Sequence, residues 1–321
     1  MHLPVIDFSL FAGGTATQKQ QIADAIGAAC REDGFFLLAN HGLDRQLVDD
    51  GFAAAKQFFD APLSVKQAMA IEHSPCHRGW YGEGGEILDG SSQPQGDYKQ
   101  GLKIGRDLSA EHPRVVAGIA LHGPNQWPEG WPHHDIFKTR MQACYAACEA
   151  LSHQLMQAFA LSLNLPQTHF APWLSLPMAT LSPLRYPPMR AEAELSAAAH
   201  TDFGCLTLLL QHDQAGLEIE RPDGNWLAVP YAPDLVVVNI GDMMARWTNN
   251  QYRSTRHRVR HQGQGPRHSM AFFFDPDPEA DLSPLPGCLA EGAAAAYPPS
   301  TALAHLLEKI EESFTYRQES P

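Results

Sequence analysis

The hydrophobic positions of the first 60 residues predict two strands, each followed by a helix. The segment "LPVIDFSL" is typical of a short strand, and the stretch from about Thr17 has apolar residues every three to four positions, as an amphipathic helix does. Gly34 is expected to end that helix before a buried strand at 35–40, "FFLLAN". Asp44 is expected to cap a second helix that ends near Phe59.

The middle of the chain predicts loops and then one long helix. Residues 74–106 are rich in Gly, Pro, Ser and Gln, which favour loops, with "DYKQGLKI" as a strand among them. From about His134 to Leu163 the apolar residues follow the period of a helix that covers a sheet. The residues expected on its buried face are Met141, Tyr145, Cys148, Ser152, Leu155 and Phe159.

After Pro177 the pattern changes to short apolar runs separated by Gly, Pro and Asp. These runs are "ATLSPLRY", "CLTLLLQ", "LEIERP", "NWLAVP", "LVVVNIG", "RHRVR" and "SMAFFFDP". Short strands with turns between them predict a β-sandwich or barrel. Because the tail from Thr301 to Arg317 is helical in pattern again, the whole chain predicts an α+β fold.

The composition narrows the classes of function. The chain has 321 residues, of which 44% are hydrophobic and 18% charged, as is typical of a globular protein with a large core. Its formal charge is −13, whereas a general binder of nucleic acid or of anionic membranes needs a broad basic surface. We therefore expect a small-molecule substrate, no nucleic-acid or membrane partner, and a monomer or weak homo-oligomer.

The six cysteines predict neither a metal site nor a disulfide. None of them forms a Cys-x-x-Cys pair, and Cys144 and Cys148 are spaced to share one face of the long helix. The first residues have no basic leader, and no apolar run approaches the length of a membrane span. These features predict a cytoplasmic protein.

Two His-x-Asp pairs are candidate metal ligands. His133 and Asp135 lie at the start of the predicted long helix, where a carboxylate is explained by the helix dipole alone. His200 and Asp202 begin the apolar run "HTDFGCLTLLLQ", where burying such groups is costly unless something binds them. On a single strand, both side chains would point to the same face. We therefore favour the second pair.

A third candidate ligand is His257 in "RSTRHRVRH", on another predicted strand. Two imidazoles and one carboxylate can occupy one face of an octahedral ion, as in non-haem Fe(II) oxygenases. His200, Asp202 and His257 are thus predicted to be the metal ligands and the catalytic centre. On the opposite face of the same strand we expect structural ion pairs rather than a nucleic-acid surface; the residues concerned are Arg256, Arg258 and Arg260.

A further group of residues could hold a carboxylate close to this metal. Arg267 and Ser269 in "RHSMAFFF" are two residues apart, so they share one face of a strand. The planar guanidinium matches a carboxylate, and the hydroxyl adds a second donor. Tyr186 in "LRYPP" could donate to the same group. Together they could bind the far end of a small dicarboxylate whose near end chelates iron.

This set of motifs resembles the isopenicillin N synthase-like branch of the 2-oxoglutarate/Fe(II)-dependent dioxygenases. The segments H-T-D, distal His and R-x-S match that family as His200, Asp202, His257, Arg267 and Ser269. The likeness also covers "REDGFFLLANHGL", "RGWYG", "LRYPP" and "VVVNIGDMMARWTNNQYRSTRHRV", and it spans nearly the whole chain.

The resemblance implies a double-stranded β-helix, or jelly roll, wrapped by N-terminal, central and C-terminal helices. It implies one compact unit over 1–321, with an N-terminal non-haem dioxygenase region at 1–125, a catalytic jelly roll at 177–281 and a C-terminal helix at 300–317. The cofactors would be Fe(II), 2-oxoglutarate and O2. The enzyme would couple decarboxylation of 2-oxoglutarate, to succinate and CO2, to oxidation of a small-molecule substrate.

The residues leave other functions open. An oxidase of the isopenicillin N synthase type keeps an R-x-S pair too, but binds a substrate carboxylate in place of the cosubstrate. An enzyme that fragments 2-oxoglutarate to ethylene and a non-catalytic small-molecule sensor are further alternatives, and the intact triad disfavours the sensor. A zinc hydrolase is disfavoured by the pair Arg267 and Ser269.

The sequence does not identify the substrate. By strand parity, Tyr98, Gln100 and Leu102 of "DYKQGLKI" could line one side of the pocket, although solvent-facing roles are equally compatible. Arg78 and Tyr81 belong to a predicted loop that could close over it. Because surface loops vary freely on one scaffold, these residues do not name a ligand.

Overall fold

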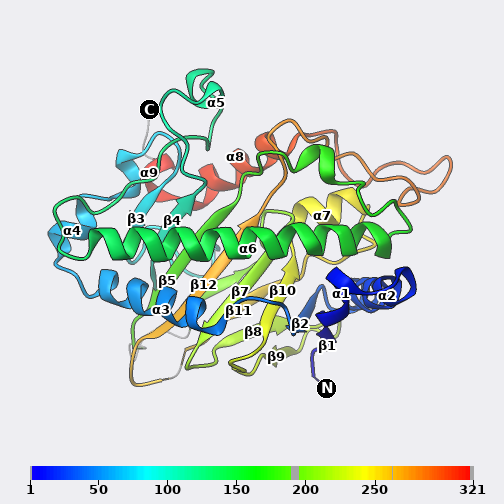
Figure 1. Ribbon diagram of the computed structural model, residues 1–321, viewed down its shortest axis with the longest axis horizontal. Coiled ribbons are helices and arrows are strands. Elements are labelled where there is room, and N and C mark those ends of the chain that lie inside the picture. The colour runs from blue at the N-terminus through cyan, green and yellow to red at the C-terminus, as the bar shows by residue number, and fades with distance from the viewer. Residues whose placement is uncertain (1, 189–194, 262, 319–321) are drawn as a thin grey trace.

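The fold is organised around a large, mostly antiparallel sheet (Figure 1). The structure, a computed structural model, describes residues 2–188, 195–261 and 263–318. In spatial order the strands of this sheet are β1 (Val5–Asp7), β2 (Phe35–Ala39), β10 (Val236–Ile240), β7 (Leu206–His212), β12 (Arg267–Phe274), β5 (Thr180–Tyr186), β4 (Gln100–Gly105) and β3 (Gly79–Tyr81). Only the pair β1 and β2 is parallel among these neighbours.

A smaller sheet lies opposite the inner face of the large one. Its strands, in spatial order, are β6 (Ala197–His200), β11 (His257–Val259), β8 (Leu217–Glu220) and β9 (Trp226–Ala228). All of their pairings are antiparallel. Two antiparallel sheets around a common interior form a jelly roll. The predicted α+β fold with a jelly-roll core is therefore confirmed.

Helices cover the outer face of the large sheet (Figure 1). The long helix α6 (His134–Ser162) crosses this face, with α3 (Arg45–Phe59) packed along its first half and α2 (Ala16–Glu32) against its C-terminal part. The residues predicted for the buried face of α6 are all buried. The other helices are α1 (Ser9–Gly13), α4 (Leu63–Gln67), α5 (Pro113–Val116), α7 (Asp242–Trp247), α8 (Ala302–Ser313), α9 (Thr315–Gln318) and the 3-10 turns Ile71–His73 and Ala171–Trp173.

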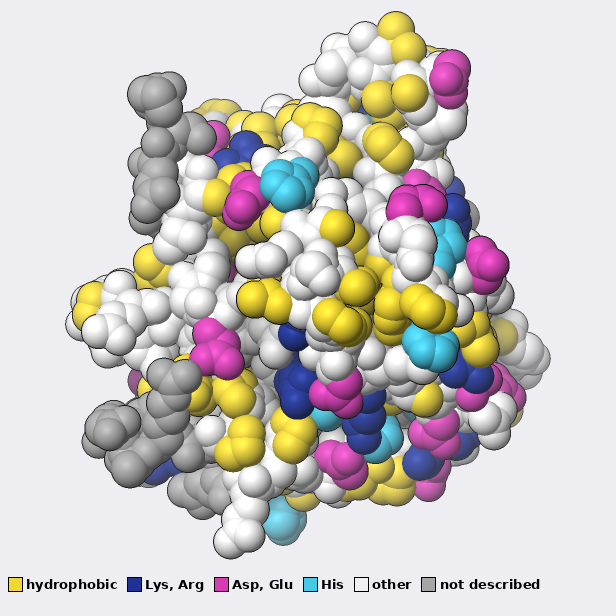
Figure 2. Space-filling model, turned by 90° about the vertical axis from the view of Figure 1, so that its left-hand side faces the viewer, with side chains coloured by type: hydrophobic (Ala, Val, Ile, Leu, Met, Phe, Trp, Pro, Cys, Tyr) yellow, Lys and Arg dark blue, Asp and Glu magenta, His cyan; other side chains and the backbone are white. Residues whose placement is uncertain are grey.

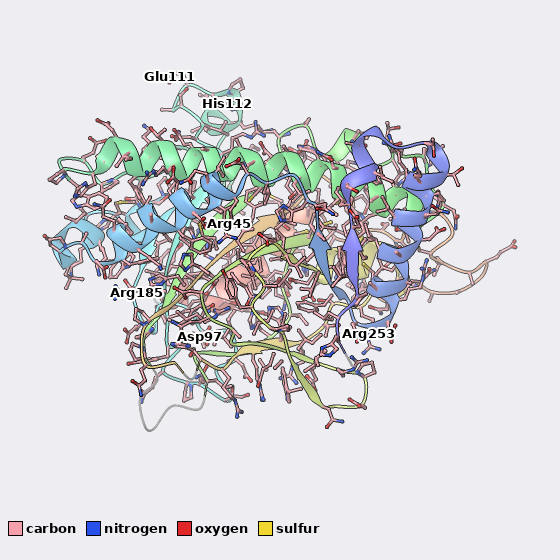
Figure 3. All side chains as sticks on the ribbon, turned by 60° about the horizontal axis from the view of Figure 1, so that its bottom comes forward. Arg45, Asp97, Glu111, His112, Arg185 and Arg253 are labelled. Atoms are coloured by element: carbon pink, nitrogen blue, oxygen red, sulfur yellow. The ribbon has the colours of Figure 1, made fainter. Side chains whose placement is uncertain are left out.

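Local signals place the ends of the N-terminal helices as predicted. Gly34 follows α2 with a positive φ of 67°, a conformation that glycine adopts without strain. The Asp44 carboxylate accepts a hydrogen bond of 2.8 Å from the Leu47 amide, which caps α3. The short helix α5 lies in a projecting segment with Glu111 and His112 (Figure 3). No helix of the described chain is long and apolar enough to cross a membrane.

One prediction about the strands is wrong: residues 200–211 do not form a single strand. Strand β6 ends at His200 and β7 begins at Leu206, with a turn between them. The backbone of this turn bonds to the start of α7, since the Asp242 amide donates to the Asp202 carbonyl (2.8 Å). The turn also packs tightly, because a Cβ on Gly204 would collide with the Asp275 carboxylate.

The C-terminal helix predicted over 300–317 is interrupted at Phe314. This residue has an extended backbone (φ −114°, ψ 122°) between α8 and α9. It forms a β-bridge with Glu86, and the Ile87 amide donates to the Ser313 carbonyl (2.7 Å). The break turns the Phe314 ring, which is buried, toward the rings of His77 and Tyr81. A helical sequence pattern does not reveal this tertiary pairing.

Candidate active site

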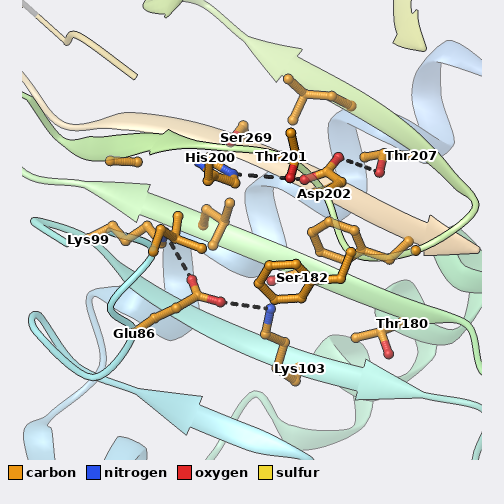
Figure 4. A pocket seen from close by; sticks show the side chains of 18 of the residues that line it. Glu86, Lys99, Lys103, Thr180, Ser182, His200, Thr201, Asp202, Thr207 and Ser269 are labelled. Carbon is orange, nitrogen blue, oxygen red and sulfur yellow. Dashed lines mark hydrogen bonds and ion pairs between the residues drawn. The ribbon is translucent and has the colours of Figure 1, made fainter. Parts of the chain in front are cut away.

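A cavity lies between the two sheets (Figure 4), and side chains of α8 line one side of it. The inner faces of β4, β5 and β12 form one wall, and the ends of β6 and β11 form another. The three predicted metal ligands and the predicted carboxylate-binding residues all line this one cavity. The structure thus brings together residues that are up to 83 positions apart in the chain, from Tyr186 to Ser269.

The predicted metal ligands converge on a single point. His200 ends β6 and faces His257 at the start of β11 across the antiparallel register. Nε2 of His200 and Nε2 of His257 lie 3.8 and 3.5 Å from Oδ1 of Asp202. One ligand atom from each residue lies within 4.8 Å of the others. Neighbouring ligands of an octahedral ion are about 3 Å apart, so a small contraction would suit one cation.

Backbone carbonyls orient both imidazoles. Nδ1 of His200 lies 2.8 Å from the Ala198 carbonyl, and Nδ1 of His257 lies 3.2 Å from the Thr255 carbonyl. Because a carbonyl oxygen only accepts, each Nδ1 carries the proton and each Nε2 keeps its lone pair for a metal. Burial, and then the neighbouring His257, hold the pKa of His200 well below its usual range. The ring is therefore neutral near pH 7, as a ligand must be.

Two hydrogen bonds orient the carboxylate of Asp202. Its Oδ2 accepts from Oγ1 of Thr207 on β7 and from Nδ2 of Asn239 on β10, both at 2.6 Å. The other oxygen, Oδ1, is left to face the two histidines. Burial raises the pKa of Asp202. The nearby His257 and His200 and these two hydrogen bonds together lower it by more, so the pKa lies below its usual value. Asp202 is thus ionised and offers a single oxygen, Oδ1, to a cation.

Sequence reasoning missed Thr207 and Asn239. A lone amide in the apolar strand "VVVNI" is a signal that could have found Asn239, because a buried polar side chain needs a partner. Thr207 carries no such signal, since β-branched residues are common in strands.

Removing the partners of Asp202 is expected to weaken metal binding. In Asn239→Leu or Thr207→Val the free Oδ2 would let the carboxylate rotate, and loss of such a supporting bond lowers metal affinity by about 10- to 100-fold. Anaerobic Fe(II) titration measures the effect. Thr248→Val is the matched control, because its buried hydroxyl bonds within α7 (2.8 Å to the Met244 carbonyl). Equal affinities in Thr207→Val and Thr248→Val would contradict this role.

Arg267 offers a buried guanidinium with open donors. The side chain is 1% exposed, and its Nε and Nη1 have no hydrogen-bond partner in the described chain. Nη2 has only a long contact of 3.5 Å to Oε1 of Gln211. The ring of Tyr186 lies 4.9 Å from the guanidinium, and the buried Oγ of Ser269 is also without a partner. Such orphaned donors fit an anionic ligand of the cavity.

The disfavoured candidates lie elsewhere. His133 and Asp135 are exposed at the start of α6. The arginines around His257 form ion pairs, as expected: Arg256 with Glu220 (3.1 Å) and Arg258 with Glu218 (2.7 Å).

The predicted parity of β4 is wrong. Tyr98 and Gln100 do not line the cavity: Gln100 accepts a hydrogen bond from Nε1 of Trp80 (3.1 Å), and Leu102 lies in the hydrophobic core. Two lysines on the other face, Lys99 and Lys103, line the cavity instead. The sequence predicted that Leu102 faces the ligand. In the structure, Leu102 is instead buried in the hydrophobic core on the opposite face of the sheet. Arg78 and Tyr81, predicted to lie in a loop that closes the pocket, do line the cavity, but Tyr81 belongs to strand β3 and not to a loop.

Two family models match the chain. A family model described as "non-haem dioxygenase in morphine synthesis N-terminal" matches residues 3–130, and one described as "2OG-Fe(II) oxygenase superfamily" matches residues 178–276. The chain is 35% identical to the "2-oxoglutarate-Fe(II) type oxidoreductase hxnY" of Emericella nidulans, over 93% of this chain and 86% of that protein. It is 36% identical to a "2-oxoglutarate-dependent dioxygenase" of Didymella fabae, over 81% of each.

Solved structures share the fold over nearly the whole length. A full-length Neurospora crassa protein, solved in complex with alpha-KG and thymine, is 28% identical, with a TM-score of 0.84 over 97% of this chain and 96% of that one. A putative 2OG-Fe(II) oxygenase family protein from Caulobacter crescentus is 30% identical, with a TM-score of 0.82 over 97% and 99%.

Proposed function

Because the chain belongs to the 2OG-Fe(II) oxygenase superfamily, and is thus an Fe(II)- and 2-oxoglutarate-dependent oxygenase, we propose that His200, Asp202 and His257 bind its iron. The observation that carries the assignment is the convergence of three ligand atoms within 4.8 Å, each on a group whose other polar atom is already bonded. A site so arranged presents one negative charge and two neutral nitrogens to a divalent cation.

We propose further that Arg267, Ser269 and Tyr186 hold the distal carboxylate of 2-oxoglutarate. The open donors of Arg267 and Ser269 lie on the inner face of β12, and the Tyr186 ring packs against the guanidinium. Relatives named for 2-oxoglutarate, and the Neurospora crassa structure with alpha-KG bound, favour this cosubstrate over an oxidase that uses none.

The protein residues supply binding and orientation. The two histidines and Asp202 leave other positions around the ion open, and Arg267 sets how 2-oxoglutarate lies in the cavity. When bound, iron supplies the redox chemistry by which O2 converts 2-oxoglutarate to succinate and CO2 and a substrate is oxidised. Apolar side chains, including Phe273 and Leu306, line part of the cavity.

We also propose the division of the chain into an N-terminal region at 1–125, a jelly roll at 177–281 and a C-terminal segment at 300–317, which holds α8 and α9 in place of the single helix predicted there. The substrate of the protein is a small molecule. We propose that the protein acts in the cytoplasm as a monomer or weak homo-oligomer, without a nucleic-acid or membrane partner. On the face shown in Figure 2, Lys and Arg are interspersed with Asp and Glu rather than gathered in one basic patch. The buried cysteine thiols suit a reducing compartment.

The test is spectroscopic and needs no knowledge of the substrate. Anaerobic addition of 2-oxoglutarate to the Fe(II)-loaded protein should give the visible absorption band of a 2-oxo acid chelated to iron, and O2 should then release succinate. Added succinate, which lacks the keto group, should give no band. A protein that binds Fe(II) but shows neither band nor succinate release would contradict the proposal.

A further inference from the structure

A cluster of buried charges lies on the β4 wall of the cavity. Lys99 and Lys103 project from the same face, and both approach Glu86 (Figure 4). The register of β4, β5 and β12 places Lys103 beside Ser182, four residues along the strands from the level of Arg267. At about 3.3 Å per residue, this is roughly 13 Å along the strands from Arg267. Lys103 therefore serves a different part of the cavity from Arg267, whereas Lys99, which precedes Gln100, lies at the level of Tyr186 and Arg267.

The ammonium of Lys99 forms ion pairs with two carboxylates of the protein. Its Nζ lies 2.9 Å from Oε2 of Glu86 and 2.6 Å from Oδ2 of Asp97. Asp97, which lies inside the molecule (Figure 3), accepts a second bond of 3.0 Å from the Ala198 amide on β6. This chain of contacts ties β4 to the strand that carries His200, which is a structural task. Glu86 is held further by the hydroxyl of Tyr81 (3.1 Å).

The ammonium of Lys103, in contrast, has a single and longer ion pair in the described part of the chain and can therefore donate hydrogen bonds to a ligand. Among the described residues its one ion pair is with Glu86, whose Oε1 is 3.5 Å from the ammonium. The rings of Phe273, Phe314 and Tyr81 surround the ammonium at 5.1 to 5.7 Å and exclude water from it. On the next strand, Oγ of Ser182 is fully buried and has no partner among the described residues. Figure 4 shows Lys103 rising toward Ser182.

A second cation adds to the positive potential of this wall. Arg78 is 4% exposed, donates to the Leu121 carbonyl (2.8 Å), and has no partner for its Nε in the described chain. It passes over Gly105, where a Cβ would collide with the guanidinium. Lys99 and Lys103 share Glu86, and Lys99 also pairs with Asp97, whereas no ion pair of Arg78 is found among the described residues. An anionic ligand beside Lys103 and Arg78 would therefore be favourable.

We infer that this part of the cavity binds the substrate as a small organic acid, whose carboxylate is held by Nζ of Lys103 and Oγ of Ser182. The inference rests on the proposed function, in which Arg267 is occupied by 2-oxoglutarate. The rest of the substrate faces apolar side chains, namely Phe203, Leu306 and Ile310. The ligand class is therefore a monocarboxylate with an apolar body, and Lys103 and Ser182 determine specificity rather than take part in the oxidation.

Matched acids and amides test the inference. The probes are benzoate with benzamide and hexanoate with hexanamide, titrated calorimetrically into the anaerobic protein loaded with Fe(II) and 2-oxoglutarate. We expect at least one acid to bind about tenfold more tightly than its amide, because a charged hydrogen bond is lost with the amide. Lys103→Met should remove this preference, Ser182→Ala should reduce it, and Lys103→Arg should restore part of it. Lys138→Met, a substitution on α6, should leave it unchanged.

Two outcomes would overturn the inference: amides that bind as well as acids, or acid binding that survives in Lys103→Met. Failure of every acid to bind at millimolar concentration would also overturn it. The double variant Glu86→Gln/Lys103→Met keeps the test valid if Lys103→Met alone folds poorly, since it removes both charges together. The 2-oxoglutarate absorption band separates the two proposals. If the band persists while acid preference fails, only this inference is wrong; if the native protein shows no band, the proposed function is wrong.

Discussion

Replacement of His257 by alanine is expected to abolish tight iron binding and to lower turnover by about three orders of magnitude or more. His257 supplies one of three ligand atoms that converge within 4.8 Å, and it comes from a different strand than His200. Its Nδ1 is engaged by the Thr255 carbonyl, so Nε2 is already aimed at the site. Alanine removes this nitrogen, and no other described histidine or carboxylate joins the cluster to replace it. His200→Ala should have the same effect.

Metal analysis after anaerobic Fe(II) loading and desalting measures this effect. The matched control is His133→Ala, which alters the other His-x-Asp pair of the chain at an exposed position at the start of α6. It should retain iron at the level of the native protein. Circular dichroism should show the native fold in each variant. Full iron occupancy in His257→Ala would show that the ligand assignment is wrong, and loss of iron in His133→Ala would transfer the assignment to that pair.

Arg267→Leu is expected to weaken 2-oxoglutarate binding by about two to three orders of magnitude while iron stays bound. The guanidinium is buried, two of its nitrogens have no partner in the described chain, and Ser269 beside it is equally unpartnered. Loss of one partner from a buried charge pair typically costs about 3–5 kcal/mol. Leucine fills the space over Tyr186 but donates no hydrogen bond. The proposed metal ligands lie on β6, on β11 and in the turn after β6, so their geometry should persist.

The absorption band of the Fe(II) and 2-oxoglutarate complex, titrated without O2, measures this loss directly. Arg45→Leu is the control, because Arg45 is a surface arginine (Figure 3) paired with Asp49 at 2.9 Å. It should bind 2-oxoglutarate as the native protein does. Native affinity in Arg267→Leu would mean that the distal carboxylate lies elsewhere in the cavity. Loss of iron together with 2-oxoglutarate would instead point to a folding defect.

The candidate site residues could be predicted from the sequence because each belongs to a short motif with local meaning. His-x-Asp, the distal histidine and Arg-x-Ser are composed of residue types that only metal and carboxylate binding readily explain in apolar strands. The argument that joined His200 to Asp202 was nevertheless wrong in detail, since Asp202 lies in a turn beyond β6. The two side chains meet because α7 and Asp275 hold that turn, not because they alternate on one strand.

The sequence by itself determined the helices, most strands and the set of candidate site residues, because these depend on periodicity, caps and side-chain type over a few positions. Only the tertiary structure decided which face of β4 meets the cavity, where Phe314 breaks the last helix, and that Thr207 and Asn239 orient Asp202. Each of these depends on contacts between distant segments. Strand parity assigns residues to two faces, but it does not say which face a helix will cover.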